Sequence, residues 1–191
     1  MIQRSDVMGK EVIRKETIRR LRDQNPFLRR LRSRRAQKKL LSSEEFRVSR
    51  TVMTYVSLPS EVDTRFLNEK ALELGKRIAA PYISGSDSNK IIAVELTTLD
   101  SLEKGPFGIY QPKNGFARKI PLKEIDLVVV PAIAYDRNNM RLGRGKGYYD
   151  RFLASEELSS AKTIGLAFRF QVVSSLSPDP HDRPVSRVIT D

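Results

Sequence analysis

The apolar run Leu127–Val130 constrains the fold more than any other feature of the chain, because no polar residue interrupts its Leu-Val-Val-Val sequence. Asp126 precedes the run and Pro131 follows it. Such a run is typical of a strand at the centre of a parallel sheet that is covered on both faces. Parallel neighbours need crossover connections, which are usually helices. The run therefore predicts a chain in which strands and helices alternate.

The rest of the chain follows this alternation. Apolar spacing and capping residues predict helices over residues 10–22, 27–41, 63–74 and 148–154, and a short helical turn capped within 42–45. Apolar and β-branched runs predict strands over residues 51–57, 77–80, 91–96, 163–168 and 185–189, with Pro81 closing the second. Residues 101–105 are expected to turn and 107–110 to be extended. We expect an α/β fold, a three-layer α/β/α sandwich with a mostly parallel, Rossmann-like sheet.

Length and composition limit the possible classes of protein. A chain of 191 residues with 39% hydrophobic content usually forms one domain, here 1–191, with a basic helical segment of about residues 1–50 packed on the α/β core. The absence of cysteine and the single histidine exclude disulfides, thiolate chemistry and a histidine metal cage. Any metal should therefore be oxygen-bound, as Mg²⁺ is. No apolar stretch approaches the roughly 20 residues of a membrane helix, and we expect a cytoplasmic protein.

Positive charge is concentrated near the N-terminus. Residues 1–50 hold 16 Lys or Arg against 6 Asp or Glu and so carry most of the net charge of +12. Such a segment attracts nucleic acid, an anionic membrane surface or a polyanionic small substrate, and the charge alone does not choose among them. A solvated helix face is the remaining interpretation.

The loop that follows the central strand has the composition of a phosphate site. Glycines at 143, 145 and 147 allow backbone amides to approach an anion, and Arg141, Arg144 and Lys146 supply positive charge. Asp150 adds a carboxylate suited to magnesium. The spacing fits neither a P-loop nor the dinucleotide pattern. Taken alone, the glycines also fit a tight turn before a helix.

The stretch VVVPAIAYDRNNMRLGRGKGYYDRFL, residues 128–153, resembles the signature of 5-formyltetrahydrofolate cyclo-ligases, also called 5,10-methenyltetrahydrofolate synthetases. Other pieces agree in order and spacing: KEVIR at 10–14, SEVDT at 60–64, FGIYQP at 107–112, IGLAFRFQ at 164–171 and HD at 181–182. Only the RLGxGxGYYD core is highly specific. The chain departs from the family at Asn139, where glycine is usual, but asparagine tolerates positive φ well.

The resemblance implies a ligase of one-carbon metabolism that uses ATP and Mg²⁺. Similar enzymes phosphorylate the formyl oxygen of 5-formyltetrahydrofolate, N10 attacks the activated carbon, and loss of phosphate gives 5,10-methenyltetrahydrofolate and ADP. Phosphoryl transfer needs positioning and charge neutralisation more than it needs a protein nucleophile. The lack of cysteine and of further histidines is therefore compatible with this chemistry.

The resemblance also implies roles for individual residues. Arg144 and Lys146 would lie closest to the transferred group as catalytic residues, Asp150 and Asp182 would hold Mg²⁺, and Glu61 would accept hydrogen bonds from the pterin. The nucleotide-binding residues would be Lys10, Arg14, Arg141, Leu142, Gly143, Arg144, Gly145, Lys146, Gly147, Tyr148 and Tyr149, and the folate-binding residues Val56, Glu61, Phe107 and Tyr148.

Each implied role has a plainer alternative. Lys10 and Arg14 also fit a solvated pair on one helix face, Asp182 a turn residue, Glu61 a surface charge and Phe107 a core residue. For the whole chain, the alternatives are a nucleic-acid-binding protein that uses the basic helices, an enzyme with another acceptor, and an inactive family member. The phosphate-site residues lie outside the basic helices, so nucleic acid is the less favoured partner. We expect a monomer that acts on a small folate and has no membrane partner.

Overall fold

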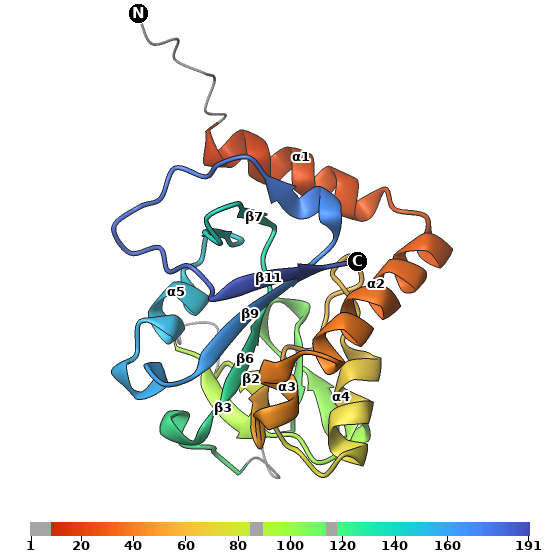
Figure 1. Ribbon diagram of the computed structural model, residues 1–191, viewed down its shortest axis with the longest axis vertical. Coiled ribbons are helices and arrows are strands. Elements are labelled where there is room, and N and C mark those ends of the chain that lie inside the picture. Colours follow the sequence, from red (N-terminus) through yellow and green to blue (C-terminus); the bar gives the residue numbers. More distant parts are fainter. Residues whose placement is uncertain (1–8, 85–89, 114–117) are drawn as a thin grey trace, which may run out of the picture.

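The computed structural model describes residues 9–84, 90–113 and 118–191, and its centre is a six-stranded sheet (Figure 1). The strands are β1 (Thr51–Met53), β2 (Arg77–Tyr82), β3 (Ile92–Glu95), β6 (Leu127–Val130), β9 (Lys162–Ala167) and β11 (Arg187–Thr190). Their order across the sheet is β11-β9-β6-β1-β2-β3. All neighbours are parallel except β2 and β3, which are antiparallel. The apolar run is indeed a central strand.

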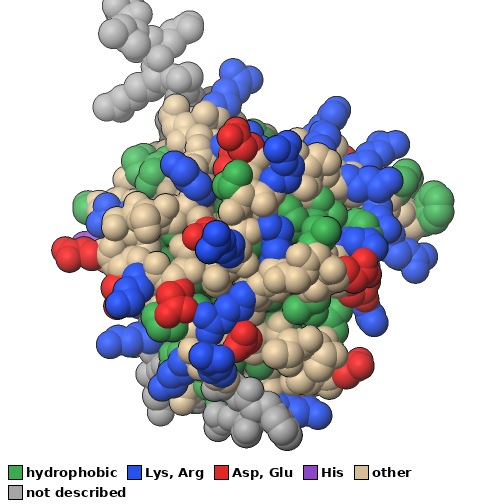
Figure 2. Space-filling view, turned by 60° about the horizontal axis from the view of Figure 1, so that its bottom comes forward, with side chains coloured by type: hydrophobic (Ala, Val, Ile, Leu, Met, Phe, Trp, Pro, Cys, Tyr) green, Lys and Arg blue, Asp and Glu red, His purple; other side chains and the backbone are tan. Residues whose placement is uncertain are grey.

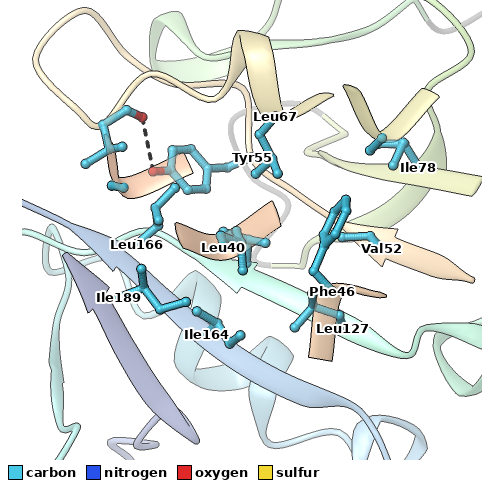
Figure 3. Packing of buried hydrophobic residues seen from close by; sticks show 14 of the residues in the cluster. Leu40, Phe46, Val52, Tyr55, Leu67, Ile78, Leu127, Ile164, Leu166 and Ile189 are labelled. Carbon is cyan, nitrogen blue, oxygen red and sulfur yellow. Dashed lines mark hydrogen bonds between the residues drawn. The ribbon is translucent and has the colours of Figure 1, made fainter. Parts of the chain in front are cut away.

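Helices cover both faces of this sheet. They are α1 (Lys10–Arg22), α2 (Pro26–Leu41), α3 (Glu44–Val48), α4 (Arg65–Glu73) and α5 (Tyr148–Leu153). Alternate strand residues point to opposite faces of the sheet, and each face has its own hydrophobic cluster. Val129 belongs to the first cluster, which includes residues of α1 to α4. Val128 belongs to the second cluster, which includes residues of α5. Figure 3 shows Leu40 of α2, Phe46 of α3 and Leu67 of α4 meeting the strand residues of the first cluster. The predicted α/β fold with a mostly parallel sheet is confirmed.

Two smaller sheets flank the main one. One is the antiparallel pair β4 (Leu102–Lys104) and β5 (Tyr110–Pro112). The other joins β7 (Ala134–Asp136), β8 (Arg141–Leu142) and β10 (Val172–Val173). The sequence did not predict β7, β8 or β10, and β4 occupies part of the stretch that was expected only to turn. These strands are two or three residues long, too short for a periodic pattern.

Several predicted boundaries were wrong. The first strand ends at Met53, not at residue 57, and β11 begins at Arg187, not at 185. Pro81 lies inside β2 and does not close it. Pairing of β2 with β1 ends at Ala79, so the missing N–H of Pro81 interrupts no bond on that side. The piece expected to be extended over 107–110 contains a 3-10 turn in which Phe107 has φ 59°.

The described part of the basic segment contains α1, α2 and α3. Helix α2 has the buried side chains Ser33, Ala36, Gln37 and Leu40. Its cations are mostly exposed, and Figure 2 shows Lys and Arg side chains gathered at its right-hand edge, on the side where α2 lies in Figure 1. Three of them have partners: Arg29 donates to the Pro59 carbonyl, Lys39 donates to the Thr190 carbonyl, and Arg34 lies over the Phe66 ring. Residues 1–8 lie outside the described part. No described helix is long and apolar enough to cross a membrane.

Candidate active site

A cavity of about 380 Å³ opens at the carboxyl ends of β1, β2 and β6. Val56 follows β1, Ile83 follows β2 and Ala132 follows β6, as expected for ligand sites in open α/β sheets. The cavity is lined by Tyr55, Val56, Leu58, Glu61, Pro81, Ile83, Ile91, Phe107, Ile109, Pro131, Ala132, Ile133, Arg141, Gly143, Arg144, Lys146, Gly147, Tyr148, Tyr149 and Asp150. One wall is thus apolar, and the other is the predicted phosphate loop.

The β7–β8 hairpin sets the start of this loop. The Asp136 side chain is buried and accepts hydrogen bonds from the backbone amides of Asn138, Met140 and Leu176, each at 2.9 Å. Asn139 has φ 61°, so it adopts the conformation for which asparagine is a suitable replacement for glycine. The hairpin leads directly to the phosphate loop, because Arg141 is the first residue of β8.

Arg141 anchors the loop from beneath. Its guanidinium donates to Asp150 Oδ1 at 2.5 Å, and the two side chains are 4% and 20% exposed. Its Nε is buried and has no hydrogen-bond partner. The sequence predicted a phosphate contact for Arg141 and a metal contact for Asp150 but did not predict that the two residues pair. The pair neutralises both charges at the cavity floor.

A second ion pair crosses the cavity mouth. Arg144 donates from Nη2 to Glu61 Oε1 at 3.1 Å, and the other carboxylate oxygen of Glu61 accepts the Leu58 amide at 3.0 Å. Glu61 is 13% exposed and Arg144 44%. The structure therefore brings the predicted folate carboxylate to the predicted catalytic arginine.

Two aromatic rings stand beside these charges. Phe107 lies in the turn between β4 and β5, 52% exposed, with its ring centroid 6.0 Å from that of Tyr148. Lys146 Nζ lies 5.6 Å from the centroid of the Phe107 ring. Because Phe107 is exposed, the alternative that it is a core residue is wrong. The rings and the cation provide a surface for a flat, polar ligand.

Helix α1 brings two predicted cations toward the loop. Ile13 packs against Ala134 and Leu142, and this contact fixes the first half of the helix. Arg14 then donates from Nε to the Gly143 carbonyl at 3.2 Å. Leu142 is buried in this contact, its carbonyl accepts the Ile133 amide, and it is not among the cavity-lining residues, so the structure does not bring it to the cavity.

Lys10 forms ion pairs with Asp182 at 2.5 Å and Asp179 at 2.6 Å. Burial alone would lower the pKa of Lys10, but hydrogen bonds to the two carboxylates raise it above its ordinary value. Burial likewise favours a higher pKa for Asp182, and the Lys10 and Asp179 hydrogen bonds reverse this to a net lowering. Both side chains are thus held charged, and Asp182 is more than a turn residue.

The described residues contain no cluster of three or more metal-binding side chains. Asp150 and Asp182 are hard oxygen donors of the kind that Mg²⁺ prefers, but each is paired with a cation of the chain. Two carboxylates leave most of an octahedral shell open. They fit a magnesium ion whose remaining ligands are phosphate oxygens and water.

Sequence reasoning missed most of the apolar wall. Tyr55, Ile83 and Ile133 lie just beyond three strands, so strand ends were a usable signal for them. Ile91 and Ile109 enter the cavity from elements that no local pattern connects to it. Burial strongly raises the pKa of the Tyr55 hydroxyl, which donates to the Val62 carbonyl at 3.1 Å, so Tyr55 is a structural member of the wall (Figure 3).

Comparisons with known proteins bear on this site. The sequence model of the 5-formyltetrahydrofolate cyclo-ligase family matches residues 6–191. A probable 5-formyltetrahydrofolate cyclo-ligase of Caenorhabditis elegans is 33% identical over 162 residues, covering 79% of this chain and 77% of that protein. The 5-formyltetrahydrofolate cyclo-ligase of Mus musculus is 29% identical over 189 residues, covering 95% and 93%. The solved structure of Aquifex aeolicus 5,10-methenyltetrahydrofolate synthetase superposes with a TM-score of 0.80 at 31% identity, covering 95% and 89%.

Proposed function

Because the chain belongs to the 5-formyltetrahydrofolate cyclo-ligase family, whose members are ligases acting on folate, we propose that it converts 5-formyltetrahydrofolate and ATP into 5,10-methenyltetrahydrofolate, ADP and phosphate. One observation carries the proposal beyond the family. A single cavity joins the cations of the 143–147 loop to a carboxylate and two aromatic rings. A phosphate donor and a pterin can therefore meet there.

The nucleotide phosphates would bind along the loop. Arg144 and Lys146 are exposed at the cavity and would neutralise the transferred phosphoryl group, where charge is spread over three oxygens. Arg14 reaches the Gly143 carbonyl from α1 and would steady the loop from the other side. The amides of Gly145 and Gly147, both at positive φ, would face the anion.

Asp150 and Asp182 would hold a magnesium ion together with phosphate oxygens, and the ion would supply further charge neutralisation at the phosphates. Arg141 and Lys10 now pair with these carboxylates. We propose that each of these cations would turn toward the phosphates if the ion replaced it.

The folate would lie against the apolar wall. Val56, Phe107 and Tyr148 line the cavity and would contact the flat pterin, while Glu61 would accept hydrogen bonds from its 2-amino group and ring N–H. In the reaction, the formyl oxygen forms a bond to the γ-phosphorus and ADP leaves. N10 then attacks the formyl carbon and loses its proton to solvent, and the oxygen departs with the phosphate. No protein nucleophile is required.

The direct test is an absorbance assay for 5,10-methenyltetrahydrofolate with ATP and Mg²⁺ present, omitted singly, and omitted together. We expect product only when both are present. Product formed without ATP, or none from protein that binds ATP and 5-formyltetrahydrofolate, would refute the proposal.

Glu61→Gln tests the placement of the folate. We expect it to lose folate binding while ATP binding persists, because Glu61 lines the cavity and would accept hydrogen bonds from the pterin but none from the nucleotide. Glu103→Gln is a matched control, since Glu103 lies in β4 and is not among the cavity-lining residues. Equal effects of the two changes on folate binding would contradict the placement.

A further inference from the structure

The Arg144–Glu61 ion pair joins two subsites that the proposed function keeps separate. Arg144 belongs to the nucleotide loop and Glu61 to the folate wall, and they lie 83 positions apart in the sequence. In the structure, the Arg144 guanidinium occupies the carboxylate that the proposed pterin needs, and Glu61 occupies the guanidinium that the proposed nucleotide needs. We infer that this pair makes the binding of nucleotide and folate cooperative, and this inference rests on the proposed function.

The two members of the pair differ in freedom. The Glu61 backbone amide donates to the Leu58 carbonyl, and its Oε2 accepts the Leu58 amide, both at 3.0 Å. This turn holds the carboxylate with Oε1 aimed at Arg144. The Arg144 side chain is 44% exposed and stands on a backbone flanked by Gly143 and Gly145, whereas the Glu61 side chain is only 13% exposed. The arginine can therefore swing away, whereas the glutamate stays in place.

Competition follows from this arrangement. A pterin that donates hydrogen bonds to Glu61 must displace the guanidinium. The affinity for folate alone is therefore reduced by the free energy needed to break the ion pair. A nucleotide phosphate draws Arg144 away and leaves Glu61 free to accept the pterin. By thermodynamic linkage, folate must raise the affinity for nucleotide by the same factor. Because the arginine side is 44% exposed, the factor should be modest, about five-fold.

The test is calorimetric titration with 5-formyltetrahydrofolate, with and without Mg²⁺ and a non-hydrolysable ATP analogue. In the unaltered protein, we expect the analogue to lower the folate Kd about five-fold. In Arg144→Ala, folate alone should bind about as tightly as it does to the nucleotide-loaded protein, and the analogue should add nothing. Thermal melting checks that the variant is folded.

Lys146→Ala is the matched control. It removes a cation from the same loop, but Lys146 lies beside the Phe107 ring and not on Glu61. This variant should bind the analogue more weakly. At saturating analogue, however, its folate Kd should still fall by the same factor as in the unaltered protein. An equal loss of coupling in both variants would assign the effect to the net charge of the loop and overturn the inference.

Three outcomes separate this inference from the proposed function. Product formation together with a coupling factor of one in the unaltered protein would overturn only the inference. The same holds if Arg144→Ala weakens folate binding in the absence of nucleotide. A protein that neither binds 5-formyltetrahydrofolate nor forms product would overturn both.

Discussion

The Arg141–Asp150 pair should carry a measurable part of the stability of the protein. Asp150→Ala leaves a guanidinium that is 4% exposed without its carboxylate, and uncompensated buried charges cost about 3–5 kcal/mol. Asp150 is itself 20% exposed, so we expect the lower end, about 3 kcal/mol. In a chain of this size, that loss lowers Tm by about 6–12 °C. Urea unfolding followed by circular dichroism measures the free energy directly.

Two further variants make this prediction specific. Asp182→Ala removes another carboxylate near the site, but Lys10 retains Asp179 at 2.6 Å, so the cost should be only about 1 kcal/mol. The double variant Arg141→Met/Asp150→Ala removes both charges and should recover most of the loss. An Asp150→Ala protein with the unfolding free energy of the unaltered protein would refute the reasoning, as would a double variant no more stable than Asp150→Ala.

Three other perturbations have distinct expected results. Lys146→Ala should lower turnover about 100-fold, because it removes charge stabilisation at the transferred group, while Tm stays within a degree or so; initial rates and thermal melting check this. Gly165→Ala would place a Cβ 2.6 Å from the Tyr135 ring and should cost about 1–3 kcal/mol in urea unfolding, and an unchanged value would contradict the packing. For Asp182, burial favours a raised pKa but hydrogen bonds from Lys10 and Asp179 produce a net lowering. The stability that the Lys10–Asp182 pair adds is therefore complete above the ordinary carboxyl pKa of 3.8 and is lost as pH falls through the lowered pKa. Comparing the unaltered protein with Lys10→Met down to about pH 2 checks this, and a stability difference that does not shrink in acid would contradict it.

The sequence predicted those parts of the fold that depend on local or periodic signals. Helix α1 has the predicted bounds, and β6 coincides with the apolar run. The predicted strand ends were wrong where tertiary contacts determine them. The β-branched run after Met53 continues in sequence, yet the chain leaves the sheet there and its residues line the cavity. Pro81 stays in β2 because the neighbouring strand has already ended.

Several candidate residues of the motif line one cavity, whereas Lys10, Arg14 and Asp182 are not among its lining residues, and the sequence predicted none of the contacts between them. The motif named Arg144, Lys146 and Asp150, and strand ends pointed to one edge of the sheet. Nothing in the sequence indicates that Arg144 faces Glu61, because the order of β1 and β6 in the sheet brings these segments together. Ion pairs between distant segments depend on topology, and a single sequence does not encode topology as a local pattern.

The contacts of α1 have a consequence for the order in which the protein is made. Lys10 meets Asp182, and Arg14 meets the Gly143 carbonyl, so the first helix closes against segments that are synthesised late. A growing chain on the ribosome can form local helices early, but it cannot complete these contacts until residue 182 has emerged. Helix α1 therefore reaches its final contacts only after the segment around residue 182 has been made, and the assembled site forms late in the synthesis of the described residues.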